Sequence, residues 1–405
     1  MKSLLAGLLF LVPGAFPVLS RAAPGEFTPL PEKDPADHQP VVWRGVPGDT
    51  LRWGDTIIID DEPITGTGVR NDRSTYGSQY GRMLRLPGGR WLAAYTVSRN
   101  PGYRKDPRGG YELEIAESRD GCRTWKRISL LSDPGRDLDN AALLRLPDGA
   151  LLLAGRSVRW QESYRLPVYR SADGGRTWKK LSTIDANEGR PGALGKPDKG
   201  VYEPHFHFLD DGRLAVMYAN EKHVTDDVSY SQIISEKISA DGGRTWGREI
   251  WVAYTPGHSA SRPGMPVWTR MKDGRYIVVY EVCGPEQCNV YYKASRDGIT
   301  WPVGLGTSIP GQTGGPYILS LDDGRLVVTS NRGNISVSND FGRSWHTAAR
   351  PWQPKKDYAA DWTQTIWSSL YQTGRDEIGI VTTVRREAGG HNIRLRLGKL
   401  SKPGK

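Results

Sequence analysis

The chain has 405 residues, of which 37% are hydrophobic and 9% aromatic, a composition typical of a globular protein. Its formal net charge is +10, but no run of lysine and arginine is longer than two residues. The absence of a basic stripe argues against nucleic acid as a partner, whereas a polyanionic wall polymer such as pectin is compatible with the charge.

Residues 1–22 have the pattern of a secretory signal peptide. Lys2 precedes an apolar stretch over residues 4–19, and small residues precede a cleavage site after Ala22. A membrane anchor is disfavoured because this stretch is short and contains two prolines. No other apolar run approaches the length needed to span a membrane. We therefore expect a secreted or periplasmic protein with no membrane span after signal removal.

The rest of the chain predicts one domain. Residues 23–45 are rich in proline and acidic groups and predict an extended lead-in, and no linker interrupts residues 46–400. A motif of the form Ser-x-Asp-x-Gly-x-Thr-Trp recurs along this domain. Its aspartate can accept backbone N–H groups and its glycine can take a positive φ, so each copy predicts a tight turn between strands. The five copies cover residues 118–125, 171–178, 239–246, 295–301 and 338–345.

A second repeat, out of phase with the first, consists of two apolar runs around a glycine-containing turn, which predicts a β-hairpin. Its turn glycines recur every 50–63 residues, a length that suits a four-stranded sheet with its loops. We therefore predict an all-β, six-bladed β-propeller with four-stranded antiparallel blades. The hairpins cover residues 84–95, 144–155, 207–218, 269–280 and 319–330, with a degenerate copy over residues 369–384.

The three cysteines predict at most one disulfide. Cys283 and Cys288 are close enough for a local disulfide in an oxidising compartment, and Cys122 lies alone in the first turn motif. Two cysteines at this spacing could also begin a metal site, but no second pair of cysteines or histidines completes one. We expect neither a metal nor a cofactor.

The hairpin repeat locates the functional face. The start of the first strand and the end of the second lie at one rim, opposite both the hairpin turns and the Asp motifs. Glu203 and Glu221 occupy this rim in the third blade, and Glu281 occupies it in the fourth. Two close carboxyl groups push their pKa values apart, and glycoside hydrolysis needs one protonated and one ionised carboxyl. These three glutamates are our catalytic candidates.

Each candidate also has a structural interpretation. A glutamate at a strand end is usually solvated, and Glu221 could simply pair with a nearby cation. Glu203 is harder to dismiss, because it interrupts an apolar strand, where an unpaired carboxylate is costly. The remaining rim positions predict substrate-binding side chains, although the arginines could instead pair with the glutamates and the histidine of the inner strand could line the channel. These positions are Arg82, Asn140, Arg156, His205, His223, Arg262, Tyr317 and Trp367.

These motifs resemble the sialidase superfamily, and several segments between residues 200 and 326 are similar to glycoside hydrolase family 93. The resemblance covers residues 70–390 and implies a retaining exo-α-1,5-L-arabinanase that cleaves arabinan from its non-reducing end. It further implies that Glu203 and Glu281 form the catalytic pair, with Glu221 as an accessory residue. Family members can carry tyrosine where this chain has His223.

We take Glu203 as the nucleophile and Glu281 as the general acid/base, an order that the sequence leaves open. The expected substrate is an oligo- or polysaccharide and the expected state a monomer. One alternative is an exo-sialidase or another glycosidase of the superfamily, although the Phe/Tyr-Arg-Ile-Pro signature of sialidases is missing. The other is a non-catalytic, glycan-binding propeller. A short distance between the two carboxyl groups favours the enzyme.

Overall fold

We analysed a computed structural model, which describes residues 50–60, 77–98, 102–189, 194–257, 260–352, 365–385 and 391–401. The expected signal peptide (1–22) and lead-in (23–45) lie outside these residues. The described residues form strands and two short 3-10 helices, η2 (Pro87–Gly89) and η3 (Lys222–Thr225). None of the described helices is long and apolar enough to cross a membrane.

Four of the sheets contain four antiparallel strands each, in sequence order. The first consists of β6 (Asp137–Arg145), β7 (Leu151–Arg159), β8 (Ser163–Ser171) and β9 (Lys179–Glu188). The second consists of β10 (Val201–Phe208), β11 (Leu214–Asn220), β12 (Ile233–Ser239) and β13 (Ile250–Ala253). The third consists of β14 (Arg262–Arg270), β15 (Tyr276–Cys283), β16 (Asn289–Ser295) and β17 (Thr307–Thr313). The fourth consists of β18 (Tyr317–Ser320), β19 (Leu326–Thr329), β20 (Ile335–Ser338) and β21 (His346–Ala348).

A fifth, eight-stranded sheet joins the two ends of the domain. One half contains β2 (Gly77–Arg85), β3 (Trp91–Ser98), β4 (Glu112–Ser118) and β5 (Lys126–Ser132). The other contains β22 (Thr365–Gly374), β23 (Glu377–Arg385), β24 (His391–Ser401) and β1 (Thr50–Asp60), whose pairing with β24 closes the ring. The halves meet only at the parallel pair Gly77–His391.

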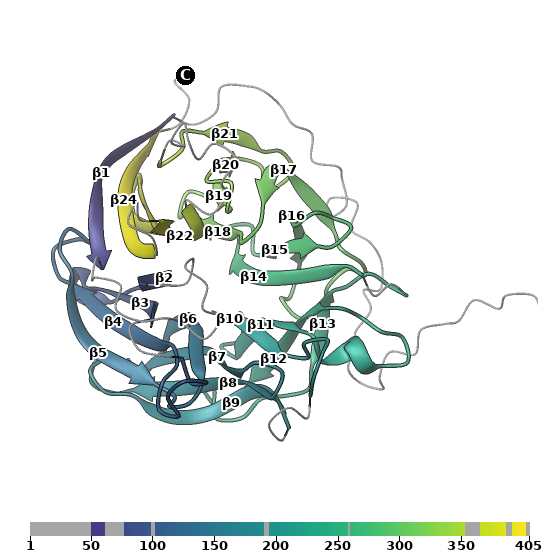
Figure 1. Cartoon of the computed structure of the whole chain (residues 1–405). Coiled ribbons are helices and arrows are strands. Elements are labelled where there is room, and N and C mark those ends of the chain that lie inside the picture. The colour runs from purple at the N-terminus through teal and green to yellow at the C-terminus, as the bar shows by residue number, and fades with distance from the viewer. Residues whose placement is uncertain are drawn as a thin grey trace, which may run out of the picture.

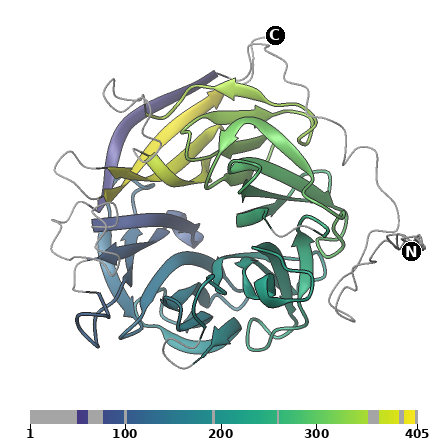
Figure 2. The ribbon, with the colours of Figure 1, turned by 45° about the vertical axis from the view of Figure 1, so that its right-hand side comes forward.

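The sheets stand around a common centre, with β2, β6, β10, β14, β18 and β22 innermost (Figures 1 and 2). The second strands are apolar and almost fully buried, as in β11 and β15, because neighbouring sheets cover both of their faces. The outermost strands, such as β5, are largely exposed. This arrangement confirms an all-β fold with four-stranded antiparallel sheets.

The five Asp-containing turns connect the third and fourth strands of their sheets. In the second copy the Asp173 carboxylate accepts the N–H groups of Arg176 and Thr177 at 3.0 and 2.9 Å. The same turn also clamps the preceding sheet, because the Ser129 hydroxyl of β5 donates to the Gly175 carbonyl at 2.6 Å and Trp178 packs beside it. These turns are therefore scaffold that joins neighbouring sheets.

Candidate active site

Five of the innermost strands carry a β-bulge at the same place. Each bulge contains a non-glycine residue whose φ lies between 53° and 60°: Tyr80, Asn140, Glu203, Met265 and Trp367. Such a conformation costs about 1–3 kcal/mol and persists where the surrounding structure enforces it. Bulges re-aim side chains and are frequent beside active sites. The five bulges therefore lie at equivalent positions of the innermost strands, and we expect the functional site to lie around them.

Glu203 and Glu281 approach each other from adjacent sheets. Glu203 lies in the bulge of β10, and its Oε2 accepts the Met265 N–H at 2.7 Å. Glu281 lies near the end of β15, and its Oε2 accepts the Gly315 N–H at 2.6 Å. A Cβ placed on Gly264 would lie 3.6 Å from Glu203 Oε2 and 3.7 Å from Glu281 Oε1. These two oxygens are consequently no farther apart than the sum of those distances.

The environment of this pair favours a shared proton. Burial, reinforced by the negative charge of Glu281, raises the pKa of Glu203 to about 7, although Arg156 and the Met265 N–H oppose the shift. Burial also raises the pKa of Glu281, against the Gly315 N–H and Arg262. Two carboxyl groups that interact in this way titrate as a pair. The pair therefore retains a proton near neutral pH.

Glu221 is the centre of a buried hydrogen-bond network beside the pair. Its Oε2 accepts the Tyr202 hydroxyl at 2.9 Å and the Gly200 N–H at 3.2 Å, and its Oε1 accepts Arg262 Nη2. Arg262 also donates to Gln232 Oε1 at 3.0 Å. Glu221 is thus an ion-pair partner that places Arg262 and Tyr202, which agrees with the structural interpretation of its sequence position.

Arg156 is similarly engaged. Its Nη2 donates to Asp139 Oδ2 at 2.7 Å, and its guanidinium lies over the rings of Trp160 and Tyr202 at 5.3 and 5.7 Å. Both of those rings are stacked, with centroids 6.0 Å apart. The two rings and the Asp139 carboxylate limit the movement of Arg156, so its charge is fixed beside Glu203.

Two cavities meet at the glutamate pair. The smaller, of about 290 Å³, is lined by Glu203, Glu221, Glu281 and Cys283, together with Arg156, Trp160, Asp198, Tyr202, Gln232 and Arg262. The larger, of about 540 Å³, shares Glu281 and Cys283 and is otherwise lined by Met265, Gln287, Cys288, Thr313, Gly314, Asn331, Arg332 and Trp367. Glu281 therefore stands at the boundary between two spaces, whereas Glu203 belongs to one of them.

Three of the expected binding residues, Arg82, His205 and Tyr317, lie together but do not line either of these cavities. Arg82 is buried in the middle of β2, over the Tyr80 ring at 3.7 Å, and its Nη1 donates to the Trp367 carbonyl at 3.0 Å. Arg82 and His205 both face the Tyr317 ring, at 5.4 and 5.9 Å. Burial lowers the pKa of His205 to about 3, so this histidine is neutral. The three residues of this group lie on the innermost strands β2, β10 and β18.

Two further expected residues have other surroundings. Asn140 lies in the bulge of β6, with its side chain buried and outside the lining of both cavities. His223 lies in η3, where its ring nitrogens face Asp226 and Glu249. Its ring packs against Trp251, with centroids 4.7 Å apart. Of the eight expected binding residues, the cavities thus contain Arg156, Arg262 and Trp367.

Several lining residues were not predicted from the sequence. Tyr202 directly precedes Glu203, and Met265 occupies the bulge of β14 that is equivalent to the Glu203 bulge of β10. A comparison of the six hairpins could have found Met265, because it lies at the same repeat position as Glu203. Trp160 and Gln232 lie on connections between strands and carry no repeat signal.

The cysteines behave as their positions suggested. Cys283 and Cys288 form a disulfide, and both line the larger cavity. Cys122 is a free, buried thiol whose pKa is raised to about 12 by burial, so it is unreactive. In the described part of the chain, no group of three histidine, cysteine, aspartate or glutamate side chains is placed to bind a metal ion.

Neither a family model nor a curated protein matches the sequence, but solved structures match the fold. An α-L-arabinofuranosidase from Fusarium graminearum, solved with an iminosugar inhibitor, is 23% identical with a TM-score of 0.68, covering 85% of this chain and 98% of that protein. An α-L-arabinanase from Penicillium chrysogenum, solved with arabinobiose, is 22% identical with a TM-score of 0.66, covering 85% and 98%.

A sialidase from Streptococcus pneumoniae is a more distant match, at 11% identity and a TM-score of 0.55, covering 86% of this chain and 71% of that protein. The protein therefore has a sialidase-like β-propeller fold, and this fold is close to that of the glycoside hydrolase family 93 enzymes. The resemblance inferred from the sequence is confirmed at the level of the fold.

Proposed function

We propose that this protein is a glycoside hydrolase that removes sugar units from the non-reducing end of α-1,5-L-arabinan, or of a related plant polysaccharide, with retention of configuration. The main support for this proposal is that the Glu203 and Glu281 carboxyl groups lie close together beside Gly264. Retaining enzymes place their two carboxyl groups about 5–5.5 Å apart, which lies within the upper limit set by that geometry. The neighbouring structures bound to arabinobiose support the choice of sugar.

The two cavities suggest which carboxyl has which role. A general acid must reach the oxygen between the sugar that is retained and the sugar that leaves, and Glu281 lines both cavities. Glu203 lines only the smaller cavity, where the retained sugar would be held. Glu203 would attack the anomeric carbon while Glu281 protonates the departing oxygen. Glu281 would then take a proton from the water that releases the sugar from Glu203.

The arginines argue against the sialidase alternative. A sialidase would need arginines that are free to bind the carboxylate of sialic acid. Arg156 and Arg262 are already paired with Asp139 and Glu221, and Arg82 is buried and does not line either cavity. A neutral sugar, by contrast, can use the aromatic wall of Trp160 and the Trp367 side chain for stacking.

We further propose that the domain has six blades, with the eight-stranded sheet as two of them, because its halves meet at a single residue pair. The domain would follow a signal peptide, and the enzyme would act as a secreted or periplasmic monomer on an oligo- or polysaccharide, without a cofactor. The Cys283–Cys288 disulfide supports an oxidising compartment.

Product analysis tests this function. The purified protein would be incubated with linear α-1,5-arabinan, debranched and branched pectic polysaccharides, and sialyl-lactose. We expect one short arabino-oligosaccharide to accumulate from linear arabinan from the earliest time point. Release of sialic acid from sialyl-lactose would show that the protein is a sialidase and would contradict the proposed substrate. Binding without turnover of any glycan would favour the non-catalytic propeller.

A further inference from the structure

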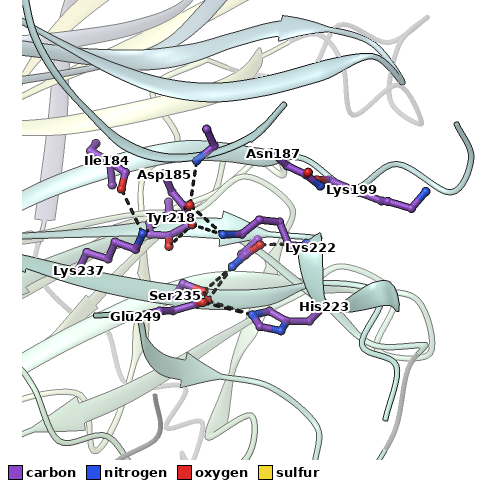
Figure 3. Close-up of polar contacts among 12 residues, drawn as sticks. Ile184, Asp185, Asn187, Lys199, Tyr218, Lys222, His223, Ser235, Lys237 and Glu249 are labelled. Carbon is purple, nitrogen blue, oxygen red and sulfur yellow. Dashed lines mark hydrogen bonds and ion pairs between the residues drawn. The ribbon is translucent and has the colours of Figure 1, made fainter. Parts of the chain in front are cut away.

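A second polar cluster lies between β11, β12 and η3 of the second sheet and β9 of the first sheet (Figure 3). Asp185 of β9 accepts Lys222 Nζ at 2.8 Å and the Tyr218 hydroxyl at 2.7 Å, and it lies 3.4 Å from Lys237 Nζ. Its carboxylate is 8% exposed. Buried charges of this kind persist when they are paired, and here two lysines compensate one carboxylate.

His223 completes the cluster on the other side of Lys222. Its Nδ1 lies 2.6 Å from Asp226 Oδ2 and its Nε2 lies 3.2 Å from Glu249 Oε1. Carboxylate oxygens only accept hydrogen bonds, so both ring nitrogens must donate, which requires the imidazolium form. Glu249 is itself held by Asn220 Nδ2 at 2.7 Å and by the Ser235 hydroxyl.

These contacts surround Glu221 along the chain. Asn220 precedes it and contacts Glu249, whereas Lys222 and His223 follow it and contact Asp185 and Glu249. The Lys222 N–H also donates to Asn220 Oδ1 at 2.9 Å, which closes the turn around Glu221. The residue that places Arg262 and Tyr202 therefore stands on a backbone turn fixed by charges outside the cavities.

We propose that His223, as an imidazolium held between Asp226 and Glu249, is a positioning residue that fixes the Glu221 turn and makes the arrangement of the active site depend on its proton. The proposal rests on the proposed function only for its kinetic readout. After loss of the proton, one ring nitrogen has no hydrogen to donate to the carboxylate that it faces. The turn then loses one of its anchors, and Glu221 no longer holds Arg262 at a fixed place in the cavity.

The direction of the pH effect follows from the groups around the ring. Burial lowers the pKa of His223, but the hydrogen bonds and charges of Glu249 and Asp226 raise it by more than burial lowers it, so the net shift is upward. Lys222 is the neighbouring cation, and Tyr218 and Tyr230 are the other titratable groups near His223 and Glu249. The imidazolium is consequently kept to a higher pH than in an ordinary histidine and is lost as the pH rises through this raised pKa.

The test compares wild type with His223→Gln by the ratio of their kcat/KM values on linear arabino-oligosaccharides from about pH 5.5 to about pH 9. Because both proteins keep the catalytic glutamates, the titration of that pair cancels in the ratio. Misplacement of an active-site group can cost up to about 100-fold, and we expect a ratio of about tenfold at pH 5.5 that falls towards one at pH 9. Glu249→Gln should reduce activity similarly, and adding it to His223→Gln should cost little more.

A ratio that does not change with pH would overturn the proposal, since a purely structural role lowers activity equally at every pH. His346→Gln, on outer strand β21, is the matched control and should keep a ratio near one. Hydrogen exchange over residues 221–226 gives a second readout that needs no substrate. If no glycan is turned over, the proposed function fails, yet faster exchange in His223→Gln than in wild type at pH 5.5 still supports the positioning role, and equal exchange rejects it.

Discussion

Replacement of Glu221 by glutamine tests how the active site is organised. The amide oxygen of the substituted side chain can accept hydrogen bonds from Arg262 or from Tyr202 and Gly200, but the amide nitrogen cannot accept from the other side. Either the bond from Arg262 or the two bonds from Tyr202 and Gly200 are therefore lost, and a hydrogen bond to a charged group is worth about 1.5–3 kcal/mol. Since the Arg262 side chain is 43% exposed and can rehydrate, we expect the free energy of unfolding to fall by about 2 kcal/mol.

The same change should affect catalysis through Arg262, which lines the smaller cavity with the glutamate pair. We expect KM to rise about tenfold, in line with the cost of a misplaced binding group. Urea denaturation with linear extrapolation measures the stability, and initial rates on arabino-oligosaccharides measure the kinetics. Glu117→Gln is the matched control, because Glu117 is buried and pairs with Arg90 at the opposite rim.

The control should lose similar stability and keep its kinetic constants. An unchanged KM in Glu221→Gln, or an equal rise of KM in Glu117→Gln, would refute the assigned role.

Three further outcomes are expected. Asp241→Ala removes the acceptor of the Arg244 and Thr245 N–H groups, both at 2.9 Å, so thermal stability should fall while kcat/KM stays at the wild-type value. Burial lowers the pKa of Lys293 from 10.5 to about 7. Between these values the unfolded chain binds the additional proton, so the stability of wild type relative to Lys293→Met should rise with pH over this window in denaturation experiments. Finally, kcat/KM should decline as the pH rises through about 7, where the pair containing Glu203 loses its proton; a rate independent of pH from about 5 to about 9 would contradict this shared proton.

The repeat architecture could be predicted because its chemistry is local. An aspartate, a glycine and a tryptophan within eight residues specify the turn, and the hairpin direction then places Glu203, Glu221 and Glu281 at one rim. The structure brings these three glutamates to the same cavity.

The bulges could not be predicted, because their cause is not local. Tyr80, Glu203, Met265 and Trp367 have no intrinsic preference for a positive φ, and contacts between sheets impose it. Asn140 is the one member of this set whose residue type tolerates that conformation well.

The surroundings of Arg82 and His223 were equally hidden. Arg82 donates to a carbonyl 285 residues away along the chain, and His223 contacts Glu249 across the second sheet. Hairpin direction predicts the rim at which a residue lies, whereas the depth and partner of its side chain depend on how the sheets pack.

The anomeric configuration of the first product tests the central claim most directly. Proton NMR during hydrolysis of a linear α-1,5-arabino-oligosaccharide would follow the product before it equilibrates in solution. Action by Glu203 as nucleophile and Glu281 as acid/base predicts a first product that retains the α configuration, together with loss of turnover in Glu203→Gln. A first product of inverted configuration, or near-normal turnover in Glu203→Gln, would contradict the account.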